Sequence, residues 1–220
     1  MEGPFYNGAW LLSARRTYFD YLLPKILPAE TAEKIPPYYF YDLQGHVFSD
    51  LNEKDRISVS IYRGIDDLIF DNLGLTADWG NNTYSLSFRR VFNEKLVGNF
   101  LVASSEFFTN FNLGGDDGLN SENKILDQTL SANLTFFQTS DLEWRTGAQI
   151  KQLDFKYLNT FLEDTSFSIG ENPIEAGFYT KLKWKGFSRF IIEPGLRYNY
   201  YSVYSSTPYI DLRLGAKYLL

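Results

Sequence analysis

The sequence contains no cysteine and only one histidine, His46. Without cysteine the chain can form neither a disulfide scaffold nor a thiolate metal site. A single histidine excludes a cluster of His ligands, and we expect His46 to be a polar residue on the hydrophilic side of a strand. The sequence also has no phosphate-binding glycine loop and no serine-hydrolase elbow. We therefore expect no cofactor, no metal site and no enzymatic activity.

Long hydrophobic runs and an excess of positive charge are lacking too. The longest apolar runs, such as 100–103 and 190–192, are far shorter than the roughly 20 residues that a membrane helix needs. A membrane-spanning form of this chain must therefore use β-strands. The net charge of −6 gives no basic surface for nucleic acid, so we expect no nucleic-acid partner. The first residues lack the basic and apolar segments of a secretory signal, and we expect no signal peptide.

Aromatic residues and alternating polarity are abundant instead. Aromatic side chains make up 18% of the sequence, which is typical of strands and of the aromatic girdles of membrane barrels. In 189–200, Phe190, Ile192 and Leu196 fall on one side of an extended chain, whereas Glu193 and Arg197 fall on the other. Successive side chains of a strand point to opposite faces, so the pattern predicts a strand with one apolar and one charged face.

The same alternation recurs along most of the chain and predicts ten strands. We place them at 9–18, 38–49, 56–64, 77–91, 96–109, 128–138, 142–156, 173–184, 188–202 and 208–219. In 142–156 the apolar positions change parity, which predicts a bulge near Lys151 and Gln152. The remaining segments predict short turns on one rim and long links at 20–37, 65–76, 110–127 and 157–172. A short, proline-broken helix is plausible in 20–34, and 110–127 is predicted to be a solvated loop rather than a calcium site at Asp116 and Asp117.

Two environments suit strands with one apolar and one charged face. In a soluble, lipocalin-like barrel the apolar side would face inward, whereas in an outer-membrane barrel it would face lipid. Strand length, long links on one rim and aromatics at both strand ends favour the membrane barrel. Its lumen would then be lined by oppositely charged side chains on neighbouring strands. The candidates for this lumen wall are Glu143, Arg145, Lys151, Glu175, Lys181, Arg189, Glu193, Arg197, Asp211 and Arg213.

Several phrases of the sequence resemble a known family. They are EGPF at 2–5, WLLSARRTY at 10–18, YYFYD at 38–42, DRISVS at 55–60, WGN at 79–81 and EPGLR at 193–197. These phrases resemble the barrel region of TonB-dependent outer-membrane receptors, especially Bacteroidetes-like ones. The resemblance implies a bacterial outer-membrane location, contact with lipid, a plug domain, a TonB complex that supplies energy, and import of a siderophore, vitamin or glycan-like nutrient.

The sequence departs from that family in having no recognisable plug domain and only ten of the expected strands. We therefore expect residues 1–220 to form a single all-β segment, part of an antiparallel up-and-down transmembrane barrel. A complete ten-stranded outer-membrane barrel stays an alternative, because barrels with even strand numbers from eight upward can close. The soluble lipocalin-like binding barrel is the third possibility.

Overall fold

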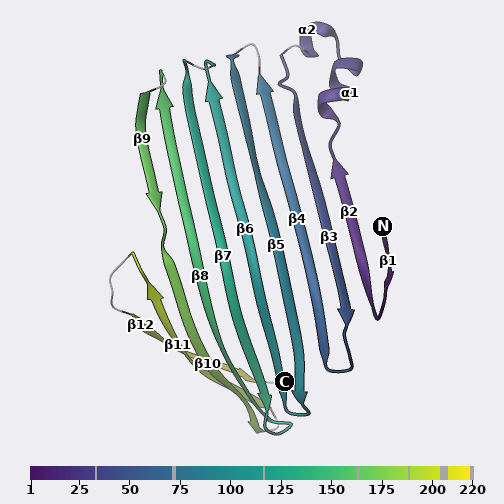
Figure 1. Ribbon diagram of the computed structural model, residues 1–220, viewed down its shortest axis with the longest axis vertical. Coiled ribbons are helices and arrows are strands. Elements are labelled where there is room, and N and C mark those ends of the chain that lie inside the picture. Colours follow the sequence, from purple (N-terminus) through teal and green to yellow (C-terminus); the bar gives the residue numbers. More distant parts are fainter. Residues whose placement is uncertain are drawn as a thin grey trace.

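A computed structural model describes residues 1–32, 34–70, 73–115, 117–162, 164–187, 189–203 and 208–218. Its strands form one antiparallel, up-and-down sheet in which, apart from β9, strands that follow one another in the chain lie side by side, as Figure 1 shows. The strands are β1 (Glu2–Phe5), β2 (Gly8–Arg16), β3 (Tyr38–Asp50), β4 (Asp55–Phe70), β5 (Leu75–Asn93), β6 (Leu96–Leu113), β7 (Leu119–Phe137), β8 (Leu142–Phe161), β9 (Asp164–Glu171), β10 (Ile174–Phe187), β11 (Phe190–Tyr201) and β12 (Tyr209–Tyr218). The predicted all-β, up-and-down fold is confirmed, and the sheet is open between β1 and β12.

All ten predicted strands are present, and the structure adds two short ones. β1 forms a hairpin with β2, and β9 pairs with β8. β9 continues the line of β10 along the same edge of β8, because Phe155 faces Glu171 and Gln152 faces Ile174 in one register. Pro173 stands between them. Its missing N–H explains why one line of pairing divides into two strands.

The long links predicted at 65–76, 110–127 and 157–172 are wrong. Strands β4 to β8 run through most of these segments: β4 ends only at Phe70, β6 reaches Leu113 and β8 reaches Phe161. The Asn, Asp and Gly residues there look like loop residues, yet each segment finds a neighbour of equal length to pair with. In the structure, therefore, long links do not mark one rim of the sheet.

The remaining long link, 20–37, contains the helices, as predicted. They are α1 (Phe19–Ile26), which includes Pro24, and α2 (Ala29–Ala32). Arg16 at the end of β2 donates to Asp20 in the first turn of α1 at 2.6 Å and so ties this helix to the sheet. None of the described helices is long and apolar enough to cross a membrane.

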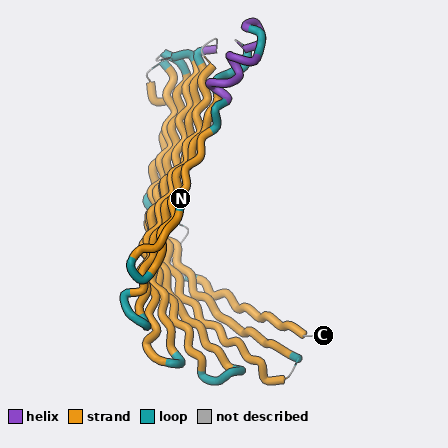
Figure 2. The backbone as a smooth tube through the Cα atoms, turned by 90° about the vertical axis from the view of Figure 1, so that its right-hand side faces the viewer, coloured by secondary structure: helices purple, strands orange, loops and turns teal. Residues whose placement is uncertain are grey.

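Within the described ranges the sheet has no second layer packed against it. Viewed along its edge in Figure 2, it is one curved layer in which the C-terminal strands swing out of the plane of the others. Among the described residues no hydrophobic side chain is fully buried. The fold is therefore held by its hydrogen-bonded strand pairs, and the described residues provide no layer that covers its apolar side chains.

Gly147 in β8 provides a close contact that can test the packing within this layer. The Tyr179 ring lies over it and donates a hydrogen bond from its hydroxyl to Asn133 at 2.8 Å. A Cβ at position 147 would lie closest to Oδ1 of Asn133, 2.6 Å from Cε1 of Tyr179 and 2.9 Å from the Ala132 carbonyl oxygen, so a larger residue must displace this hydrogen-bonded pair.

We predict that Gly147→Val lowers the free energy of unfolding of the whole protein by about 1–3 kcal/mol, the usual cost of overpacking. The measurement is urea unfolding of the protein folded in detergent micelles. Gly170→Val is the control, because nothing lies within 4 Å of its added Cβ. Equal midpoints for the two variants would contradict the close packing described around Gly147.

Candidate functional site

Strand register divides the side chains between two faces of the sheet. One face carries the odd-numbered residues of β2, β5–β8 and β10–β12 and the even-numbered residues of β3 and β4; we call it the polar face. The other, the apolar face, carries the alternate residues. Lys151, for example, faces Thr129 on β7 and Glu175 on β10, all on the polar face. Since pairing from β7 through β8 to β10 is in continuous register, the bulge predicted at Lys151 and Gln152 is wrong.

The apolar face carries a continuous row of exposed aliphatic side chains. Val59, Leu86, Val102, Leu130 and Ile150 face one another in turn across β4 to β8. Their exposed fractions are 41%, 43%, 54%, 56% and 53%. A soluble protein rarely leaves such a contiguous apolar surface open to water. This face therefore requires an apolar partner.

The two faces exchange character along the length of the sheet. Beyond the row of Ser104, Gln128 and Gln152, toward the upper end in Figure 1, the apolar face becomes charged. Lys124 and Glu106 form an ion pair at 2.6 Å there. In β8 the apolar residues change from even to odd positions because the two faces exchange character there. The backbone needs no bulge to produce this change of parity.

Above the same row the polar face becomes aromatic and aliphatic. Phe107, Ile125 and Phe155 face one another across three strands, and Tyr157 contacts Phe167 of β9 with ring centroids 5.9 Å apart. Phe107 and Phe108 are neighbours in β6 and therefore lie on opposite faces. The aromatics expected at this end of the strands are thus divided between the two sides of the sheet.

The charged candidates for the lumen wall lie together on the polar face, except Arg189. Arg189 precedes β11 and donates to the Tyr218 hydroxyl at 3.4 Å. Register places three pairs of opposite charge side by side: Lys151 with Glu175, Lys183 with Glu143, and Arg197 with Asp211.

The ion pairs that form within this group follow the register only in part. Lys183 Nζ lies 3.7 Å from Glu193, which stands opposite it on β11, whereas Lys151 Nζ lies 2.8 Å from Asp127, a diagonal neighbour on β7. Arg145 pairs with Glu143 of its own strand. Long side chains reach diagonal partners as easily as direct ones, so register alone does not select the partner.

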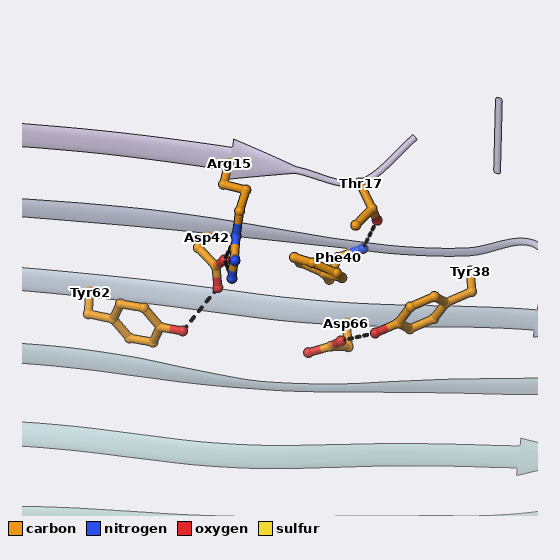
Figure 3. Close-up of polar contacts among 7 residues, drawn as sticks. All are labelled: Arg15, Thr17, Tyr38, Phe40, Asp42, Tyr62 and Asp66. Atoms are coloured by element: carbon orange, nitrogen blue, oxygen red, sulfur yellow. Dashed lines mark hydrogen bonds and ion pairs between the residues drawn. The ribbon is translucent and has the colours of Figure 1, made fainter. Parts of the chain in front are cut away.

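A second polar group, on β2 to β4, was not among the predicted site residues. In Figure 3 the carboxylate of Asp42 accepts from Arg15 on one neighbouring strand and from Tyr62 on the other. Arg15 Nε donates to one oxygen at 2.7 Å, and the Tyr62 hydroxyl donates to the other at 3.1 Å. The Arg15 guanidinium also lies 5.0 Å from the centre of the Phe40 ring. Asp42 thus links three strands.

The group continues upward along the polar face through Tyr38. Its hydroxyl donates to Asp66 at 2.5 Å, and its ring stacks on Trp79 with centroids 6.4 Å apart (Figure 3 shows the hydrogen bond). The hydrogen bond to Asp66, together with desolvation, raises the pKa of Tyr38 to about 12. Tyr38 lies at the upper start of β3, beyond the apolar row, and its hydroxyl stays protonated at neutral pH as a fixed donor.

A signal for this group was present in the sequence. The phrase YYFYD at 38–42 carries Tyr38, Phe40 and Asp42 at every second position, and such spacing places them on one face. Their partners on β2 and β4 follow only from register. His46 lies lower on the same face, as predicted, with Nδ1 2.8 Å from the Ser60 hydroxyl.

Metal ligands do not gather in the described part of the chain. No group of three or more His, Cys, Asp or Glu residues there could hold an ion. Of the two residues considered for calcium, Asp116 lies outside the described residues and Asp117 follows it in the β6–β7 connection.

We predict that Asp42→Ala lowers the free energy of unfolding by about 1 kcal/mol, because it leaves Arg15 and Tyr62 without their shared acceptor. The loss is modest because the Arg15 side chain is 68% exposed. Urea unfolding of the whole protein in detergent measures it, with Ser13→Ala on the same face of β2 as control. A midpoint for Asp42→Ala equal to that of the control would refute the linking role.

Comparison with known proteins finds relatives by structure and not by sequence. No protein-family model matches the chain, and no curated protein matches it. The chain is similar in structure to the pyoverdine-bound receptor FpvA of Pseudomonas aeruginosa, with a TM-score of 0.70, 12% identity, and coverage of 83% of this chain and 34% of FpvA.

Two further solved structures give the same result. The siderophore receptor PirA of P. aeruginosa matches with a TM-score of 0.68 and 13% identity over 100% of this chain and 35% of PirA. The hemophore receptor HasR of Serratia marcescens matches with a TM-score of 0.65 and 12% identity over 98% of this chain and 38% of HasR. The chain thus spans about a third of the length of these structures. It has the fold of part of the barrel wall of TonB-dependent outer-membrane receptors.

Proposed function

We propose that this chain forms part of the wall of a bacterial outer-membrane barrel that imports a small nutrient ligand. The observation that carries the proposal is the exchange of polarity between the two faces of the sheet. A wall that crosses a bilayer needs an apolar outer band of limited height, with polar residues opposite it in the lumen. Beyond the bilayer the outer side meets water, and its side chains can be charged.

The row from Val59 to Ile150 provides the apolar outer band, and the Lys124–Glu106 pair above it provides the charged outer surface beyond the bilayer. Lipid is the partner that such a surface fits, since the described residues bury no hydrophobic core. A soluble lipocalin-like barrel would place this surface inside and the charged ladder outside. The open, curved sheet with no fully buried apolar side chains gives that alternative less support.

The ligand class follows from the aromatic upper part of the polar face and from the structural neighbours. Phe107, Phe155, Tyr157 and Trp79 offer flat apolar surface beside the fixed donors and acceptors of Tyr38 and Asp66. Such a mixture suits a small organic ligand with polar groups. The solved neighbours include receptors for siderophores and for a hemophore with heme, and a copper transporter.

A siderophore, vitamin or glycan-like nutrient is therefore the proposed cargo. The plug domain and TonB complex implied by the family resemblance are the proposed partners. In this arrangement the charged residues from Glu143 to Arg213 on the polar face line the lumen.

Uptake in the native bacterium tests the transport proposal. We expect deletion of the gene to abolish uptake of one labelled ligand from a panel of ferric siderophores, heme, copper, vitamins and oligosaccharides. A plasmid copy should restore that uptake, and a protonophore that collapses the energy source should stop it. Unchanged uptake of the whole panel in the deletion strain would overturn the proposal.

Neighbouring residues of β7 test the orientation toward lipid. We predict that Leu130→Arg on the apolar face costs about 2–4 kcal/mol of folding free energy in bilayers, whereas Ser131→Arg on the polar face costs less than about 1 kcal/mol. Urea unfolding in phospholipid vesicles measures both. The two substitutions add the same side chain one residue apart, so the opposite order would place lipid on the other face.

A further inference from the structure

Four cations gather at the lower part of the polar face, in the C-terminal strands. Arg145 of β8, Lys181 of β10, Gly195 of β11 and Arg213 of β12 form one continuous row. Arg197 lies one row above. A cavity of about 460 Å³ opens among them, and all four cations line it together with one carboxylate, that of Glu193. These residues lie at the opposite end of the polar face from the aromatic group at Trp79.

Gly195 makes room at the centre of this row. Adjacent strands lie about 4.8 Å apart, so Lys181 and Arg213, on either side of Gly195, have backbones about 10 Å apart. Gly195 places no side chain between them, and a Cβ there would lie 3.2 Å from Cβ of Lys181. Lys181, Gly195 and Arg213 line the same cavity, so a ligand of a few heavy atoms in it would lie beside both cations.

Carboxylates do not neutralise this group completely. Glu143 pairs with Arg145, and Glu193 pairs with Lys183, which is not one of the four. Arg197 donates to the Asn199 amide oxygen at 2.7 Å, and the Asn199 amide donates in turn to Asp211 at 3.0 Å. Within the described ranges neither Lys181 nor Arg213 has a carboxylate within 4.0 Å.

The arrangement is unfavourable without an anion. Lys181 and Arg145 are direct cross-strand neighbours, and like charges in that position destabilise a sheet. The local excess of positive charge stands out in a chain whose net charge is −6. Guanidinium and ammonium groups that converge on one hollow are the usual means of holding carboxylate or phosphate oxygens.

We propose that this cavity binds a small, multiply charged oxyanion, carrying carboxylate or phosphate groups, between Lys181 and Arg213. Arg197 borders the same hollow, and Arg145 adds charge from the side of β8. The site is separate from the aromatic upper part of the face and does not depend on the transport proposal. Binding neutralises the repulsion between Lys181 and Arg145.

Calorimetric titration of the purified whole protein in detergent tests the site with two probes, citrate for carboxylates and pyrophosphate for phosphates. We expect saturable binding of at least one probe that weakens as ionic strength rises. The double variant Lys181→Gln/Arg213→Gln should weaken that binding at least tenfold. The order of the two probes identifies which oxyanion chemistry the site prefers.

The matched control is Arg63→Gln/Lys156→Gln, which removes the same two charges from the upper, charged part of the apolar face. It should leave the affinity within about twofold of the unsubstituted protein, because long-range screening at 0.15 M salt acts over about 8 Å. An equal loss in both double variants would overturn the proposal, since it would reveal only general electrostatic attraction. Absence of saturable binding by the unsubstituted protein would overturn it as well. Neither result depends on uptake in the bacterium.

Discussion

The hydrogen-bond ladder between antiparallel neighbours is the interaction on which this structure depends. Among the described residues no hydrophobic side chain is fully buried, so a packed core does not hold the strands. Strands β5 to β8 have 18 to 20 residues each and pair along nearly their whole length. Long, in-register pairing satisfies the backbone groups within the layer. That is the condition for a sheet to border lipid, where water cannot replace a missing partner.

The same ladder fixes which side chains share a face. Because side chains alternate along each strand, one continuous register carries the apolar row from Val59 to Ile150 across five strands. The row ends where both faces change character together. A change of polarity on one face alone would mark only a local patch, whereas a change on both faces marks the boundary between two solvent environments.

The polar face has two chemically different parts, one toward each end of the strands. Its upper part combines aromatic rings with fixed hydrogen-bonding groups, of which Tyr38 with Asp66 is the clearest. Its lower C-terminal part is cationic around Gly195. The Asp42 group lies in the N-terminal half of the sheet, where one carboxylate joins β2, β3 and β4.

Alternation by itself determined the all-β class, the ten main strands and the faces of residues such as Glu193 and Arg197, because the side-chain period of two is a local property of an extended chain. The tertiary structure decided the features that depend on which strand lies alongside another. It showed that 110–127 is mostly strand, since its polar residues pair with β6 and β8. It showed that the change of parity near Lys151 is an exchange of faces, and that Asp42 joins Arg15 and Tyr62. It also placed Lys181 beside Arg145 and opposite Gly195. Register between strands is set by pairing at long range, which no local pattern specifies.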